Sequence, residues 1–399
     1  MASTPSKSKG AKTTTGSSTT SHSVTSMYRV LEKNHIYISN LEAEERGTTL
    51  IEGARMIVKG DRDSVMKEDK ARELRRTAMK HACDNELTFL VNVWKKFLDV
   101  EEDTRAVKTR ADGELEDPEA AIQWIETAWQ KDNMKCNWSA DFVRGSVPKL
   151  LIKDKALKLL VDNAPRVKNP KPDLTYGLHQ DAFTDLNQEI NDMQGAGLSQ
   201  NLYHPFFVIE AKSSNNPLTE AVQQCARAGA AMVRLKRKFL GLASSKYDDN
   251  SNKIAQKGDE EGEENDDSEE KHKEEQNEED DDDDEGELAK PIPVDNYRAD
   301  EASYTFSLAL VPTGATLYVN WAEEAFSKEG KMITVNWHQH MIDTYSLEKS
   351  KDWKELHRDL DNVLDWGMLK HKNEIQGLCD RIRKHKEEKD SNKKRKIGA

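Results

Sequence analysis

The chain has 399 residues, of which 36% are hydrophobic and 33% charged, and its formal net charge at pH 7 is −13. The length allows two domains of about 100–200 residues each, but the low apolar fraction favours one sizeable core with long stretches outside it. No run of about 18 apolar residues occurs, which excludes a membrane-spanning helix, and no apolar stretch follows the initiator Met, so we expect no secretory signal.

The N-terminal residues 1–26 are almost entirely Ser, Thr, Gly and Lys. They hold too few apolar side chains to offset the entropy lost on ordering them. We therefore expect a disordered tail, with the folded domain beginning at residue 27.

Helices are expected first along the folded part. Residues 64–100 carry apolar side chains at spacings of three and four, which predicts a long helix. Asp117-Pro118 is typical of an N-cap followed by proline at the first helical position, so a second helix is expected there. A third apolar helix is expected over residues 146–161.

Strands follow these helices. "KPDLTYGL" (171–178) and "HPFFVIEAK" (204–212) predict two strands, the second buried because it is rich in aromatic and β-branched residues. Residues 217–240 then predict a helix with small side chains that permit close packing. Two further strand regions are expected at 303–324 and 331–347, before closing helices from about residue 351. This order indicates a mixed α/β domain with one central sheet.

An acidic insertion at 246–290 divides this domain into residues 27–245 and 291–383. Between residues 259 and 287 there are 20 acidic residues and two lysines, a net charge of −18, so the rest of the chain carries +5. Such a block repels itself and is expected to remain solvated and disordered. The alternative is that it mimics a nucleic-acid polyanion, screening a basic site of the same chain or meeting basic protein partners such as histones.

The C-terminal residues 384–399 form a basic tail that ends in Lys393, Lys394, Arg395 and Lys396. A compact basic cluster on a flexible end indicates either a nuclear-import signal or non-specific affinity for phosphate. The four cysteines are far apart in the sequence, which favours a reducing compartment. We therefore expect a nuclear protein. His338 and His340 are interpreted as an ordinary surface pair rather than as part of a zinc site.

The strongest chemical pattern lies at the two adjacent strands. Asp173 starts the first strand, and Glu210 and Lys212, two residues apart at the end of the next, point to the same side. If the two strands pair, the Asp173 side chain lies close to Glu210 and Lys212. Two carboxylates and the carbonyl of Ala211 then offer hard oxygen ligands suited to Mg²⁺. The alternative is an ordinary ion pair at the surface end of a strand.

Several segments together resemble the PD-(D/E)xK nuclease superfamily. The pattern consists of Pro172-Asp173, Glu210-Ala211-Lys212 after an apolar strand, and a helix with Gln223 and Gln224. More closely, "NPKPDLTYGL", "PFFVIEAKSS" and "QCARAGAAM", with "FSLALVPTGATLYVNW" and "LDWG" later, look like an uncharacterised fungal branch of nuclease-like proteins. The resemblance covers roughly residues 28–383, apart from the acidic insertion.

The resemblance implies a restriction-endonuclease-like α/β core, with a central mixed β-sheet flanked by helices. It implies that Asp173 and Glu210, with Ala211, bind Mg²⁺ or Mn²⁺, that Lys212 is the catalytic lysine, and that Gln224 or its neighbour Gln223 lies near the substrate. The interval between Asp173 and Glu210 is longer than in most members. A further acid from an early helix is also expected, with Asp141 the first choice and Glu126 the second.

Two functional hypotheses follow. The first is a Mg²⁺-dependent nuclease that hydrolyses nucleic-acid phosphodiester bonds, with DNA the favoured substrate. The second is a catalytically inactive nuclease-fold interaction module in the nucleus. Basic residues of the 217–240 helix are expected either to bind a phosphate backbone or to form a solubilising face, namely Arg227, Arg234, Lys236, Arg237 and Lys238.

Overall fold

The computed structural model describes residues 24–98, 134–138, 167, 169–199, 202–213, 218–244 and 294–397. The predicted tail covers residues 1–26, but residues 24–26 are helical because α1 (Val24–Lys33) begins at Val24. The rest of the tail, the acidic insertion and the helices expected near residues 118 and 146 lie outside these ranges. Asp141 and Glu126 lie outside them too.

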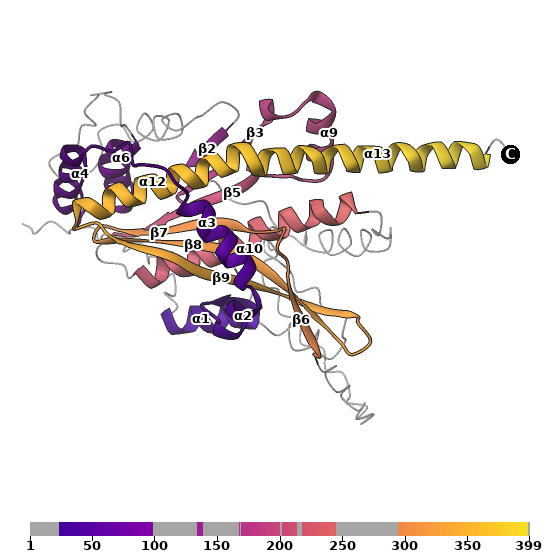
Figure 1. The fold of residues 1–399 in the computed structure, drawn as a ribbon, viewed down its shortest axis with the longest axis horizontal. Helices are drawn as coiled ribbons and strands as arrows, with labels where there is room; N and C mark the ends of the chain where they lie inside the picture. The colour runs from indigo at the N-terminus through magenta and orange to yellow at the C-terminus, as the bar shows by residue number, and fades with distance from the viewer. Residues whose placement is uncertain are drawn as a thin grey trace, which may run out of the picture.

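One mixed sheet forms the centre of the described part of the chain (Figure 1). Its main path has the order β1-β9-β8-β7-β5-β3-β2, while β4 pairs with β5 and β6 with β8. The strands are β1 Ile36–Ile38, β2 Met134–Trp138, β3 Leu174–His179, β4 Gly197–Ser199, β5 Leu202–Ala211, β6 Asn296–Ala299, β7 Thr305–Val311, β8 Gly314–Phe326 and β9 Met332–Ser346. The pairs β1–β9 and β5–β7 are parallel and the remaining pairs antiparallel.

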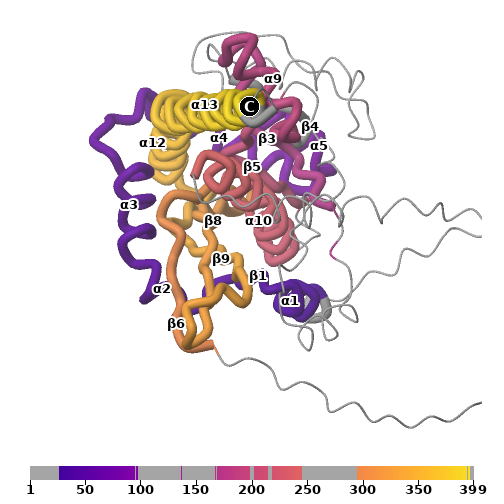
Figure 2. The backbone as a smooth tube through the Cα atoms, turned by 90° about the vertical axis from the view of Figure 1, so that its right-hand side faces the viewer, coloured from indigo at the N-terminus to yellow at the C-terminus, as the bar shows by residue number. Residues whose placement is uncertain are grey.

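Helices cover both faces of this sheet. The first group is α1 Val24–Lys33, α2 Leu41–Arg46, α3 Thr48–Val58, α4 Glu68–Lys80, α5 Glu86–Phe89, the π-helical turn η1 Leu90–Trp94 and α6 Lys95–Leu98. The others are the 3-10 turn η2 Gln180–Ala182, α9 Asp185–Met193, α10 Leu218–Ala243, α12 Ser350–Trp366, the π-helical turn η3 Gly367–His371 and α13 Lys372–Ile397. Figure 2 shows α1 and α10 on one side of β8 and β9, with α3 and α12 on the other.

This architecture confirms the predicted α/β class with a central mixed sheet flanked by helices, and it is consistent with a restriction-endonuclease-like core. The strands expected at 171–178, 204–212, 303–324 and 331–347 are present as β3, β5, β7 with β8, and β9. No helix in the described ranges combines the length and the apolar character needed to cross a membrane.

The single helix predicted over residues 64–100 is wrong, because the chain turns between α4 and α5. Asn85 restarts the helix, its side-chain oxygen accepting the backbone N–H of Thr88 at 2.8 Å. An asparagine in this role satisfies one of the free N–H groups of a helix start, so it favours a new N-terminus over a continuous helix.

The small residues of α10 allow it to pack closely on the sheet, as predicted. A Cβ atom added to Gly229 would lie 2.2 Å from the Cγ atom of Asn320 on β8. No larger side chain fits at that position unless the Asn320 side chain moves. The helix that follows β5 is therefore held tightly against the sheet.

Two expectations at the edges of the domain require correction. Residues 384–397 are the distal part of α13 rather than a flexible tail, and Figure 1 shows this helix continuing well past the sheet. His338 is buried rather than on the surface. Its ring stacks on Trp321 and on Tyr37, with centroids 4.6 and 5.4 Å away, because β9 lies inside the sheet between β1 and β8.

Candidate active site

The antiparallel pairing of β3 with β5 brings the predicted carboxylates together. Leu174 lies opposite Ile209, so Asp173, one residue before β3, lies beside the last residues of β5. Its Oδ2 atom accepts the backbone N–H of Ala211 at 2.7 Å. Asp173 is thereby held at the end of β5, with its second carboxylate oxygen outside this hydrogen bond.

Glu210 and Lys212 are buried at the same end of β5. Their exposed fractions are only 2% and 6%. The chain stays paired with β7 beyond the last residue of β5, since the N–H of Lys212 donates to the carbonyl of Leu310 at 2.9 Å. Charged side chains are seldom buried unless they are paired. The chemistry available at this end of β5 therefore depends on the partners of Glu210 and Lys212.

The partners of Lys212 reveal an acid that sequence reasoning missed. The Lys212 ammonium donates to the carbonyl of Ala211 at 3.0 Å and to Oε2 of Glu86 at 3.3 Å. Glu86 is the first residue of α5. The sequence signal for Glu86 is the helix-capping Asn85 just before it, which a single helix over residues 64–100 leaves no place for. We call Glu86, Asp173, Glu210 and Lys212 the β5 cluster.

Negative charge is in excess in the β5 cluster, which holds three carboxylates and one ammonium. Burial raises the pKa of Asp173 to about 6, although the charge of Lys212 partly opposes this. Burial and the neighbouring Asp173 raise the pKa of Glu210 well above its ordinary value. Burial would lower the pKa of Lys212, but Asp173, Glu86 and Glu210 together raise it. The lysine therefore stays protonated beside Asp173 and Glu210, which burial makes difficult to ionise.

The two glutamines of α10 differ in exposure. Gln223 is buried at 3% exposure, whereas Gln224 is partly exposed. Gln224 forms no hydrogen bond with any residue that the structure describes. Its amide is thus available to a ligand, while the structure does not connect it to the β5 cluster.

Three of the basic residues on α10 are engaged in contacts inside the protein. Lys236 is buried and pairs with Glu374 of α13 at 3.2 Å. Arg237 pairs with Asp300 and with Glu324 of β8, and Lys238 donates to the carbonyl of Gln194 at 2.7 Å. These three residues attach α10 to its neighbours, and the buried Lys236 belongs to neither a phosphate-binding nor a solubilising face. Phosphate binding by this helix stays a prediction.

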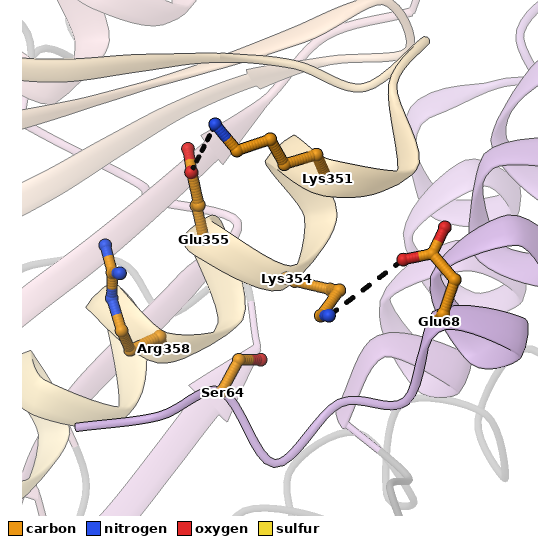
Figure 3. A pocket seen from close by; sticks show the side chains of 6 residues that line it. All are labelled: Ser64, Glu68, Lys351, Lys354, Glu355 and Arg358. Carbon is orange, nitrogen blue, oxygen red and sulfur yellow. Dashed lines mark ion pairs between the residues drawn. The ribbon is translucent and has the colours of Figure 1, made fainter.

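A surface pocket of about 210 Å³ lies away from the β5 cluster, between α4 and α12 (Figure 3). It is lined by Ser64, Glu68, Lys351, Lys354, Glu355 and Arg358. The Lys354–Glu68 ion pair at 3.9 Å joins α12 to α4 across it, and the Lys351–Glu355 pair at 3.2 Å lies along α12. Its charges largely satisfy one another, so we place the candidate chemistry at the β5 cluster instead.

The β5 cluster offers oxygen ligands for a hard cation. Among the described residues, no three His, Cys, Asp or Glu side chains are placed to hold a metal ion. Asp173, Glu210 and the carbonyl of Ala211 nevertheless supply two carboxylates and one main-chain oxygen, a set that suits Mg²⁺ with several waters retained. Burial is the main cause of the raised pKa values of both acids, with a smaller contribution from the neighbouring carboxylates, and a bound cation would favour their ionised forms. This donor set therefore fits Mg²⁺ or Mn²⁺.

Comparison with known proteins gives one match. Residues 106–254 match the family model of a domain of unknown function (DUF7924). This range includes Asp173, Glu210, Lys212 and all of α10, whereas Glu86 precedes it and β6 to β9 follow it. No curated protein and no solved structure matches the chain.

Proposed function

We propose that this protein is a metal-dependent nuclease that hydrolyses phosphodiester bonds of nucleic acid, with Mg²⁺ or Mn²⁺ as its cofactor. The observation that carries the proposal is the gathering of Asp173, Glu210, Glu86 and Lys212 at the buried end of β5. A strand-end ion pair that only stabilises the fold needs one acid for one lysine. Three acids around one lysine leave negative charge that a bound cation would neutralise.

In this proposal Asp173, Glu210 and the carbonyl of Ala211 hold the metal ion. When bound, the cation supplies a Lewis acid that polarises a phosphate oxygen and lowers the pKa of a bound water. The hydrogen bond from the N–H of Ala211 positions Asp173, leaving its second oxygen free for this role.

Lys212 is the proposed catalytic lysine. Its pKa is raised, so its ammonium remains charged and can offset negative charge on the substrate and orient the attacking water. Glu86 positions this ammonium through their contact at 3.3 Å. Gln224, whose amide has no partner in the described part of the chain, is proposed to orient the phosphate from α10.

The distal part of α13 supports nucleic acid as the partner. Between residues 381 and 397 it carries nine basic and three acidic side chains, and Lys386 to Asn392 are all exposed. A basic helix that extends away from the body presents its charges to a phosphate backbone. We propose DNA in the nucleus as the setting, with the same basic cluster as the import signal. Basic proteins remain the proposed partners of the acidic insertion.

Calorimetry with Mg²⁺ or Mn²⁺ tests the proposal, alongside nicking of plasmid DNA by the same samples. The wild type is compared with Asp173→Ala/Glu210→Ala. Glu42→Ala/Asp69→Ala is the control, since it removes two carboxylates from exposed positions. We expect metal binding and nicking in the wild type and the control, and neither in the site variant. Nicking that persists in the site variant would contradict the assigned site.

One observation favours the second candidate, an inactive interaction module on the same fold. The Lys212 ammonium contacts the carbonyl of Ala211, which the nuclease proposal assigns to the metal, so the cluster already contains an internal cation. If the wild type binds no metal at millimolar concentration and leaves DNA intact, this candidate replaces the nuclease.

A further inference from the structure

Arg227 differs from the engaged basic residues of α10. Its Nε atom is buried and has no hydrogen-bond partner. Within the ranges that the structure describes, its guanidinium forms no hydrogen bond and no ion pair. Lys236, Arg237 and Lys238, about two and a half to three turns further along the helix, all contact protein acceptors. Arg227 is therefore a cation held against the protein with its donors unused.

The position of Arg227 places it beside the β5 cluster. Helix α10 packs on β5, and the charge of Glu210 contributes to the raised pKa of the buried Cys225 thiol, two residues before Arg227. This turn of α10 therefore lies beside the end of β5. The acids whose charges act on Arg227 are Glu210 and Glu220, and Arg227 in turn acts on Glu210. The guanidinium thus lies near the proposed metal ligand without forming an ion pair with it.

A guanidinium with free donors is suited to an anion that arrives from solution. It presents five N–H donors in a fixed plane that matches two oxygens of a phosphate, and it stays charged when it is partly buried. Arg227 is only partly buried, which leaves access from outside. The carboxylate of Glu210 is excluded as its partner by the absence of an ion pair within the described residues.

We propose that Arg227 binds the non-bridging oxygens of the nucleic-acid phosphate that is presented to the β5 cluster. This inference rests on the proposed function and deepens it, since it names the residue that holds the substrate anion. Lys236, Arg237 and Lys238 have the structural partners described above, and Arg234 is not free either. The phosphate contact on this helix is therefore assigned to Arg227 alone.

The experiment measures binding of a short fluorescent DNA duplex in Ca²⁺ by anisotropy at several salt concentrations, and cleavage of the same duplex in Mg²⁺. The variants are Arg227→Gln, which removes the charge, and Arg227→Lys, which keeps the charge but loses the planar fork. Lys238→Gln is the matched control, an exposed cation on the same helix. Thermal melting verifies that each variant is folded.

We expect Arg227→Gln to weaken binding about tenfold or more, and to reduce the slope of log K against log salt by about 0.9, the value for one lost phosphate contact. Arg227→Lys is expected to keep the salt slope but to bind the duplex several-fold more weakly, because an ammonium cannot contact two phosphate oxygens as the guanidinium does. Lys238→Gln is expected to match the wild type. A purely structural role for Arg227 would not change the salt slope.

The outcomes separate this inference from the proposed nuclease activity. If the wild type binds DNA but cleaves none, while Arg227→Gln lowers the slope, the phosphate site stands and the hydrolytic function fails. If the wild type cleaves and folded Arg227→Gln has the same affinity, slope and cleavage rate, the phosphate site is overturned and the nuclease stands. A wild type that neither binds nor cleaves DNA overturns both.

Discussion

Two buried carboxylate clusters of this protein differ in how well their charges are matched. In what we call the β8 cluster, Glu323 is fully buried and accepts two hydrogen bonds from Arg46, at 2.6 and 3.1 Å, and one from Asn336 at 3.4 Å. Burial alone would raise the pKa of Glu323, but His338 and Arg46 lower it to about 2. In the β5 cluster, three acids share Lys212, and the pKa of Asp173 rises to about 6.

The difference shows that burial does not decide what a carboxylate does. Both clusters lie at the sheet, and both remove carboxylates from water. The β8 cluster satisfies its carboxylate and attaches α2 to β8, so it stabilises the fold. The β5 cluster keeps a surplus of negative charge at one end of the sheet, and groups perturbed in this way are characteristic of functional sites.

The largest expected effect comes from removing the one cation of the β5 cluster. Lys212→Met should lower the rate of DNA cleavage by about 10³-fold, or about 4 kcal/mol of transition-state stabilisation. Single-turnover cleavage measures this, with circular dichroism to verify folding. Lys351→Met, at an exposed lysine, should cleave at the wild-type rate. Activity of Lys212→Met within tenfold of wild type would remove Lys212 from the mechanism.

Breaking the β8 cluster should affect stability instead. Glu323→Ala leaves Arg46 without its carboxylate, and we expect a loss of about 2 kcal/mol in the free energy of unfolding, since Arg46 retains some contact with water. Urea unfolding measures it. Because the pKa of Glu323 is lowered on folding, its contribution is present above about pH 4.5 and is lost as the pH falls toward 2. A loss that is unchanged at pH 3 would contradict this assignment.

A smaller change is expected when Glu86 is neutralised. Glu86→Gln removes one of the charges that raise the pKa of Lys212, so the alkaline limb of the pH–rate profile should move to lower pH. The maximal rate should fall about tenfold, or about 1.4 kcal/mol. Glu86→Asp should restore the position of the alkaline limb. An unchanged pH profile for Glu86→Gln would show that Glu86 acts only in packing.

The smallest predicted effect has the opposite sign. Asp173→Asn keeps an acceptor for the N–H of Ala211 but removes a buried charge, so we expect it to stabilise the protein by about 1 kcal/mol at pH 8. The pKa of Asp173 is raised on folding, so the free energy of unfolding of the wild type falls as the pH rises from about 4 to about 6 and Asp173 ionises. The difference in unfolding free energy between Asp173→Asn and the wild type should therefore vanish near pH 4. Urea unfolding at both pH values tests it, and destabilisation at pH 8 would contradict the surplus of charge.

The sequence by itself determined the local parts of the site. The apolar run before Glu210 predicted β5, and the alternation of side chains along a strand placed Glu210 and Lys212 on one side. Pro172 and the short strand after it placed Asp173 at the start of β3. These features depend on a few neighbouring residues, which is why periodicity reveals them.

Only the tertiary structure decided which distant residues complete the site. Glu86 contacts Lys212 across a separation of 126 residues. Three α10 cations have their partners on α13, on β8 and directly after β6, and after α9. His338 became buried because β9 lies between two other strands. Periodicity shows which side of a strand or helix is apolar, but not which charged group will meet it. That pairing depends on the packing of the whole sheet with its helices.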